Sequence, residues 1–186
     1  MSNIQCPKEG IMALYSFDNR SPKMGKGAYV HPTADVIGDV TLGEGTFVGA
    51  GAVIRGDYGR IVVGRNCSVE ENCMVHARPG EVCTIGDWVT VGHAAVVHNA
   101  KMIHDYAVIG MGAIVSDYAE VGEWAIVAEG AVVKNGQVIA PNTVNVGAPA
   151  KAVKEVTEEM KAQWRIFKQN YVDLARTYPE RMKRLD

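Results

Sequence analysis

The sequence predicts an all-β protein, a parallel β-helix of hexapeptide repeats in about six coils, with one C-terminal α-helix. Aliphatic residues recur every six residues in three phased blocks, and small or β-branched residues follow most of them four positions later. The composition agrees, because 20 glycines and only 7% aromatic residues are typical of small side chains packed at fixed places in a repeat. A period of six fits neither the 3.6 of a helix nor the 2 of a flat strand.

The repeat itself gives the dimensions of the β-helix. Each hexad makes one short strand and a corner, so three hexads make one triangular coil of about 18 residues, stacked about 4.8 Å from the next. The phase slips by three after Ile54 and by four through ARPGEVC, and these extra residues should loop out to keep the stacking in register. The seventeen predicted inward residues are Val30, Val36, Leu42, Val48, Ile54, Val63, Val69, Val75, Ile85, Val91, Val97, Ile103, Ile109, Val115, Val121, Val127 and Val133.

Other patterns flank the repeat. Residues 1–29 are expected to form a loose N-terminal leader and one short strand over 12–17, residues 30–138 the β-helix, and residues 139–156 a connecting tail rich in proline and glycine. Residues 157–186 hold the helix, for which Thr157 is a suitable N-cap. Its apolar stripe alternates steps of four and three and predicts about 20 helical residues ending near Pro179, packed along a prism. The stripe consists of Met160, Trp164, Phe167, Tyr171, Leu174 and Tyr178.

Composition excludes several functional classes. A net charge of -2 gives no basic excess for nucleic acid, and no apolar run approaches the ~18 residues of a membrane span. The N-terminus lacks the pattern of a signal peptide. The four cysteines form no CxxC pair, so we expect reduced thiols in a cytoplasmic protein. They are Cys6, Cys67, Cys73 and Cys83.

Three of the five histidines gain a spatial meaning from the repeat. Arg55, His76 and His98 each follow an inward residue, and these inward residues lie three hexads apart. The three side chains should therefore form one outward column, with His76 and His98 about one rung apart. His31 and His104 have no partners in such a column and are expected to be ordinary surface histidines.

His93 belongs to the preceding hexad and should point away from the other two histidines. It could join them only if a second copy of the chain packed alongside, for which threefold closure is the natural symmetry of triangular prisms. Three histidine ligands leave a fourth position for water, the open arrangement of catalytic zinc, which lowers the pKa of bound water to about 7. The sequence thus predicts a metal held by His76, His93 and His98 between subunits, and an inactive monomer.

The hexads, the stretch RGDYGRI (Arg55 to Ile61) and the histidine gaps of 17 and 5 resemble the gamma-class carbonic anhydrase family over nearly the full chain. RGDYGRI, MVH, VGH and VGAPAK (Val146 to Lys151) are most similar to the branch that includes the thioesterase PaaY and the carnitine-operon protein CaiE. The resemblance implies a left-handed β-helix, a homotrimer, and Zn²⁺, or alternatively Fe²⁺ or Co²⁺, at each subunit interface.

The resemblance also assigns roles to residues beside the metal. Arg55 and Asp57 match an ion pair near the interface, which either orients the site or serves as a structural bridge. Glu70 stands where the family usually has Gln; when ionised it can only accept hydrogen bonds, so it is a candidate general base. Tyr171 matches a tyrosine that approaches the metal in some relatives, and a core role for it is equally open. Tyr58 stands where the archetypal enzyme of this family has a glutamate. The long acidic loop that serves that enzyme as a proton shuttle is absent from this sequence.

Three functions remain open, and the enzymatic ones act on small molecules, carbon dioxide or an acyl-CoA. The first is a carbonic anhydrase-like lyase, in which zinc-bound hydroxide attacks carbon dioxide to give bicarbonate. The second is an acyl-CoA thioesterase that uses the same metal-bound water, as in PaaY. The third is a hexapeptide acyltransferase or a non-catalytic scaffold, because fold does not fix function.

Overall fold

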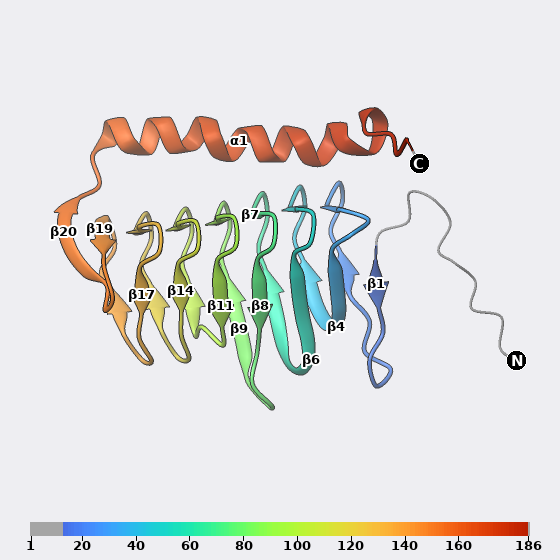
Figure 1. Cartoon of the computed structure of the whole chain (residues 1–186), viewed down its shortest axis with the longest axis horizontal. Helices are drawn as coiled ribbons and strands as arrows, with labels where there is room; N and C mark the ends of the chain where they lie inside the picture. The colour runs from blue at the N-terminus through green and yellow to red at the C-terminus, as the bar shows by residue number, and fades with distance from the viewer. Residues whose placement is uncertain (1–12, 186) are drawn as a thin grey trace, which may run out of the picture.

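A computed structural model describes residues 13–185 as a left-handed parallel β-helix with one helix along its side (Figure 1). Successive strands along the chain lie on different faces of a triangular prism, and all but the last pair in parallel with the strand one coil away. The fold class predicted from the period of six is confirmed.

The prism has three faces, and we call the first the histidine face because its strands include His76 and His98. It stacks β1 (Leu14–Tyr15), the first halves of β4 (Asp35–Leu42) and β6 (Val53–Val63), β8 (Met74–His76), β11 (Val96–His98), β14 (Ile114–Val115) and β17 (Val132–Val133).

The face that comes next along the chain is called the third face. It stacks β2 (Lys23–Met24), the second halves of β4 and β6, β9 (Val82–Ile85), β12 (Met102–Ile103), β15 (Glu120–Val121) and β18 (Val138–Ile139).

The helix face completes each coil. It stacks β3 (Tyr29–Val30), β5 (Phe47–Val48), β7 (Ser68–Val69), β10 (Thr90–Val91), β13 (Val108–Ile109), β16 (Ile126–Val127) and β19 (Thr143–Val146), and β20 (Lys151–Glu155) joins β19 antiparallel.

The interior of the prism is a ladder of aliphatic side chains. All seventeen predicted inward residues are at most 1% exposed. Because burial of one such side chain contributes roughly 1.5–3 kcal/mol, this ladder is the main source of stability. Cys67, Cys73 and Cys83 lie in it as free, buried thiols, and burial raises the pKa of each to about 12. Cys6 falls outside the described residues.

The β-helix has about seven coils, one more than the hexads counted from Val30 predict. Leu14 already pairs with Val36 and Met24 with Leu42, so the first coil starts before the periodic block. At the other end Val144 pairs with Ile126. Stacking thus extends beyond residues 30–138 on both sides, in stretches whose side chains depart from the six-residue pattern. Residues 1–12, most of the expected leader, lie outside the described range.

The two phase slips form adjacent insertions at the corner between the histidine face and the third face. The pairing of β4 with β6 shifts register by three residues between Gly38 and Val40, which pushes Asp57 and Tyr58 outward. The second insertion, residues 78–81, is exposed and forms the protruding loop between β8 and β9 (Figure 1). A Cβ added at Gly59 would lie 2.2 Å from the Arg78 carbonyl oxygen, so the two insertions touch.

Helix α1 (Glu158–Arg181) runs along the helix face of its own prism (Figure 1). Thr157 caps it as predicted, since its side chain accepts a hydrogen bond from the Met160 N–H at 3.2 Å. The helix continues two residues past Pro179, whose missing N–H costs little in a last turn. The predicted stripe has one exception: Phe167 is 43% exposed, and Lys168 takes the buried place beside it.

No helix within the described residues is long and apolar enough to cross a membrane.

Candidate functional site

The structure places His76 and His98 side by side on the histidine face. They are register partners in β8 and β11, and their ring centroids lie 5.3 Å apart with 52° between the planes. Arg55 is the partner of His76 on the preceding coil. The outward column predicted from the repeat is therefore present.

A carboxylate holds each ring of this histidine pair. Asp57 Oδ1 lies 3.2 Å from His76 Nε2, and Asp57 Oδ2 accepts a hydrogen bond from Arg55 Nη1 at 2.6 Å. Asp117 Oδ1 lies 3.1 Å from His98 Nδ1. Hydrogen bonds of this kind fix the orientation of metal-binding imidazoles. Arg55 and Asp57 thus form an ion pair that lies against the histidine pair through the contact of Asp57 with His76.

The charges around His76 favour its neutral form. Burial lowers the pKa of His76, and the nearby Arg55 lowers it further against the opposing pull of Asp57. Burial alone would raise the pKa of Asp57, but hydrogen bonds from Arg55 and His76 outweigh burial and hold the pKa below its usual value. A neutral imidazole is the form that binds a metal ion.

Sequence reasoning missed Asp117 and Arg78. Arg78 Nε donates to Asp117 Oδ1 at 2.5 Å and Nη2 donates to Oδ2 at 3.0 Å, a two-pronged ion pair that lowers the pKa of Asp117. Arg78 lies in the second insertion, where the repeat does not predict which way a side chain points. Asp117 follows the position that continues the histidine column on the next coil, and that offset was the available signal.

His93 lies apart from this pair, at the corner between the helix face and the histidine face. Its Nε2 is 3.2 Å from Glu70 Oε2, and its Nδ1 is 2.6 Å from Glu71 Oε2. Its side chain is 46% exposed. Among the described residues no three histidine, cysteine or acidic side chains gather closely enough in one chain to hold a metal ion.

Glu70 and Tyr171 belong to the corner of His93. Glu70 is buried, and burial raises the pKa of its carboxyl. It is hydrogen-bonded to Tyr171 and, at 3.3 Å, to Ser68 Oγ. Tyr171 also packs its ring on Phe47, 5.4 Å between centroids. A cavity of about 140 Å³ adjoins Glu70 and His93 and is lined on one side by Trp164 of α1.

An apolar column runs along the histidine face beside the histidine pair. Its five members pair in register from coil to coil and are half-buried to exposed in the single chain: Val53, Met74, Val96, Ile114 and Val132. Ile114 is 40% exposed. A row of outward aliphatic side chains on a flat sheet is the usual composition of a surface that another subunit covers.

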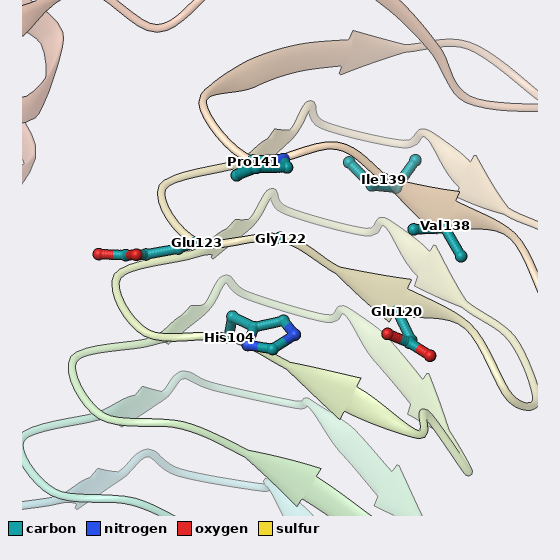
Figure 2. Close-up of a pocket in the computed structure, with 7 residues that line it drawn as sticks. All are labelled: His104, Glu120, Gly122, Glu123, Val138, Ile139 and Pro141. Carbon is teal, nitrogen blue, oxygen red and sulfur yellow. The ribbon is translucent and has the colours of Figure 1, made fainter.

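The other two histidines are separate from this site. His104 lines a shallow hollow of about 280 Å³ on the third face, where it lies next to Glu120 of the following coil while Glu123 points away (Figure 2). His31 is half-buried and pairs with the Thr33 hydroxyl at 2.8 Å. Neither contacts the histidine pair or His93 in the described structure.

The stacked hexads define the class, a hexapeptide-repeat protein, and the chain belongs to the hexapeptide transferase family. Residues 21–56 match the family model for bacterial transferase hexapeptide, six repeats. A Bacillus cereus protein described as a candidate acetyltransferase is 33% identical with a TM-score of 0.89, over 92% of this chain and 99% of that one.

Two further relatives extend this placement. A hexapeptide transferase family protein from Anaplasma phagocytophilum is 31% identical with a TM-score of 0.84, over 89% of this chain and 98% of that one. The carnitine operon protein CaiE of a Proteus strain is 40% identical over 65 residues, 35% of this chain. That match spans a third of CaiE, 33% of its length.

Proposed function

We propose that this family member is a metal-dependent enzyme of the gamma carbonic anhydrase type, acting on carbon dioxide between neighbouring copies of the chain. His76 and His98 of one copy and His93 of a second copy would hold the ion. The observation that carries the proposal is the histidine pair one coil apart, each ring held by its own carboxylate.

The donor set suits a divalent ion such as zinc. All-imidazole sites bind Zn²⁺ and also Fe²⁺ or Co²⁺, and metal–nitrogen distances of about 2.0–2.1 Å require donor nitrogens about 3.4 Å apart. Rings whose centroids are 5.3 Å apart can converge on one point to that extent. The lowered pKa of His76 keeps that ring ready for binding near neutral pH.

The second copy is needed because His93 sits at a corner of the prism while the histidine pair sits on a face. A corner of one prism meets a face of the next when three prisms close around a threefold axis. The apolar column next to the histidine pair supplies the surface for such packing. A homotrimer therefore completes the site that one chain leaves divided.

The bound ion would supply a water of lowered pKa as the nucleophile. The chain's own residues then have distinct tasks. Asp57 and Asp117 orient the two rings, and Arg55 and Arg78 fix those carboxylates. Glu70 faces His93 and the adjoining cavity, where it can accept a proton from water during turnover, and Tyr171 holds it in place.

His98→Ala tests the proposal directly. The variant should lose bound metal, measured by elemental analysis of the purified protein, and carbon dioxide hydration, measured by stopped flow. Circular dichroism should stay unchanged, because His98 points outward and contributes nothing to the inward ladder. His104→Ala is the matched control and should keep both metal and activity. Stoichiometric metal in the His98 variant would contradict the assigned ligands.

Acyl transfer is the second candidate, favoured by the two relatives of 33% and 31% identity over most of their length. An acyl-CoA thioesterase using the same water is the third. Assays of carbon dioxide hydration, thioester hydrolysis and acetyl transfer on one metal-loaded preparation separate them. Acetyl transfer that survives His98→Ala would replace the proposal, because it would require no metal centre.

A further inference from the structure

The corner between the third face and the helix face carries aromatic side chains where the backbone disfavours them. Seven coils place one residue each at this turn position with φ between 55° and 68°. Four of the seven are Gly or Asn, which tolerate this left-handed region, whereas a bulky side chain is unfavourable there. The column consists of Gly27, Gly45, Asn66, Trp88, Tyr106, Trp124 and Asn142. Retained strain of this kind points to a functional use.

The three aromatic rings form one stack parallel to the coils. Trp88 and Tyr106 are 6.2 Å apart between centroids with 3° between planes, and Tyr106 and Trp124 are 4.5 Å apart with 5°. The Trp124 end is covered by the Arg165 guanidinium, 5.0 Å from the ring centroid, and by Lys161 at 5.6 Å. The Trp88 end faces coils where the column has only Asn66 and glycines.

A cavity of about 370 Å³ lies at the Trp88 end, between this corner and α1. Its walls are Lys26, Gly27, Glu44, Gly45, Asn66, Trp88, Gln169, Val172 and Arg176. A Cβ added at Gly27 would meet no atom within 4 Å, so the space is open there. A second cavity, of about 230 Å³, shares Trp88 and Gln169 and continues past Tyr106 to Arg165. Together they leave room for one more flat ring on the stack.

The residues that line the cavity favour one kind of aromatic ring. The amides of Asn66 and Gln169 can hydrogen-bond to the edge of a heteroaromatic base stacked on Trp88. Lys26 and Arg176 supply positive charge for an anionic group on that ring, and Asp173 of the same helix holds both Gln169 and Arg176 in place. Glu44 is the acid among the lining residues and can accept a hydrogen bond from a sugar hydroxyl.

From these features we propose that the open end of the aromatic stack binds a nucleotide. The base stacks on Trp88, the phosphate lies toward Lys26 and Arg176, and α1 forms the outer wall. This site is independent of His76, His93 and His98, which lie on the histidine face and at its corner with the helix face. The competing explanation is that the stack only supports α1, since Arg165 and Lys161 already contact Trp124.

Trp88→Asn separates the two explanations. Asn occupies the same turn position at Asn66 and Asn142, so the variant should fold at least as well as the parent chain. Calorimetric titration with AMP should show saturable binding to the parent protein and affinity about 5- to 150-fold weaker for the variant. Tyr118→Asn, also an aromatic-to-asparagine change at a left-handed position but at another corner, is the matched control and should bind AMP normally.

Further titrations assign the parts of the ligand. Adenosine should bind more weakly than AMP, and Arg176→Ala should remove most of that difference, while inorganic phosphate alone should show little heat. Equal AMP affinity in Trp88→Asn and the parent, or no saturation of the parent up to millimolar AMP, would overturn the proposal and leave the stack as a support for α1. Metal content does not enter any of these outcomes.

Discussion

At the residue scale, the site depends on pairs of side chains that the repeat brings together from different coils. His76 and His98 are 22 positions apart, yet they are neighbours because one regular coil of about 18 residues and the insertion of four residues separate them. Asp57, the carboxylate partner of His76, comes from the first insertion, whereas Asp117, the partner of His98, comes from a corner of a regular coil. The repeat thus positions the two histidines, and residues of an insertion and of a corner orient their rings.

Lys168 is a second residue whose behaviour follows from its position. It is 2% exposed, with Nζ 3.1 Å from Thr90 Oγ1 and 3.2 Å from the Ala107 carbonyl oxygen. Burial lowers its pKa to about 7, against the smaller opposing effects of Cys67 and Glu70. Between pH 7 and about 10 the unfolded chain therefore binds this proton and the folded chain does not, which makes stability rise with pH.

Lys168→Met removes this titration. The parent protein should gain free energy of unfolding as pH rises from 7, by up to ~1.4 kcal/mol per pH unit from this residue, because the cost of the buried charge disappears. The variant should lack that contribution and be more stable than the parent below pH 7. Urea unfolding at several pH values between 6 and 10 measures both curves. A constant difference between the two proteins across that range would show that Lys168 does not titrate there.

The residue-scale site was predictable only in part. The six-residue phase is enough to place Arg55, His76 and His98 in one column, because inward and outward directions follow from it. Arg78 was not predictable, because the direction of a side chain in a four-residue insertion depends on contacts with other coils. Asp117 lies one residue past the histidine column in a regular coil, so its place followed from the repeat, but its contact with His98 did not. Glu70 and Tyr171 meet only through the docking of α1, which a stripe of apolar residues suggests without giving the register.

At the element scale, the two insertions act as one unit. Gly59 of the first lies against the carbonyl oxygens of Arg78 and Glu81 in the second, with 2.2 and 2.7 Å from an added Cβ. The unit carries Asp57 and Arg78, which orient His76 and, through Asp117, His98. The absence of a side chain at Gly59 therefore allows the close approach of the two insertions, which carry Asp57 and Arg78.

Gly59→Ala should force the insertions apart. Overpacking against backbone atoms destabilises by ~1–3 kcal/mol, which lowers the melting temperature by roughly 2–4 °C per kcal/mol in a chain of this size. The displaced Asp57 should also weaken zinc binding, measured by competition with a chelating dye. Tyr58→Ala, at the neighbouring position where the side chain is 57% exposed, should change the melting temperature far less. A Gly59→Ala protein that melts and binds zinc like the parent would refute the coupling.

At the scale of the whole molecule, the prism separates its sites by face and corner. The histidine pair and the apolar column share the histidine face, His93 stands at the next corner, and α1 covers the helix face (Figure 1). The period of six predicts this architecture well, since every coil repeats the same directions. It underestimates the coil number because the end coils contain residues such as Met24 and Asn145 at inward-facing register positions, outside the aliphatic pattern.

Because His76 and His98 lie on a face and His93 lies at a corner, the proposed metal site forms only when copies of the chain assemble. Val96→Lys places a charge in the apolar column, between Met74 and Ile114 on the neighbouring coils. Burying that charge against a second copy without a partner would cost several kcal/mol, so the protein should become monomeric in light scattering after gel filtration. Because His93 would then have no neighbouring pair to complete, bound zinc and carbon dioxide hydration should fall together, although the variant stays folded.

Val138→Lys is the matched control, since Val138 is 67% exposed on the third face and the same charge there leaves the histidine face untouched. A monomeric Val96→Lys protein that still holds one zinc per chain would show that the three histidines do not meet across an interface.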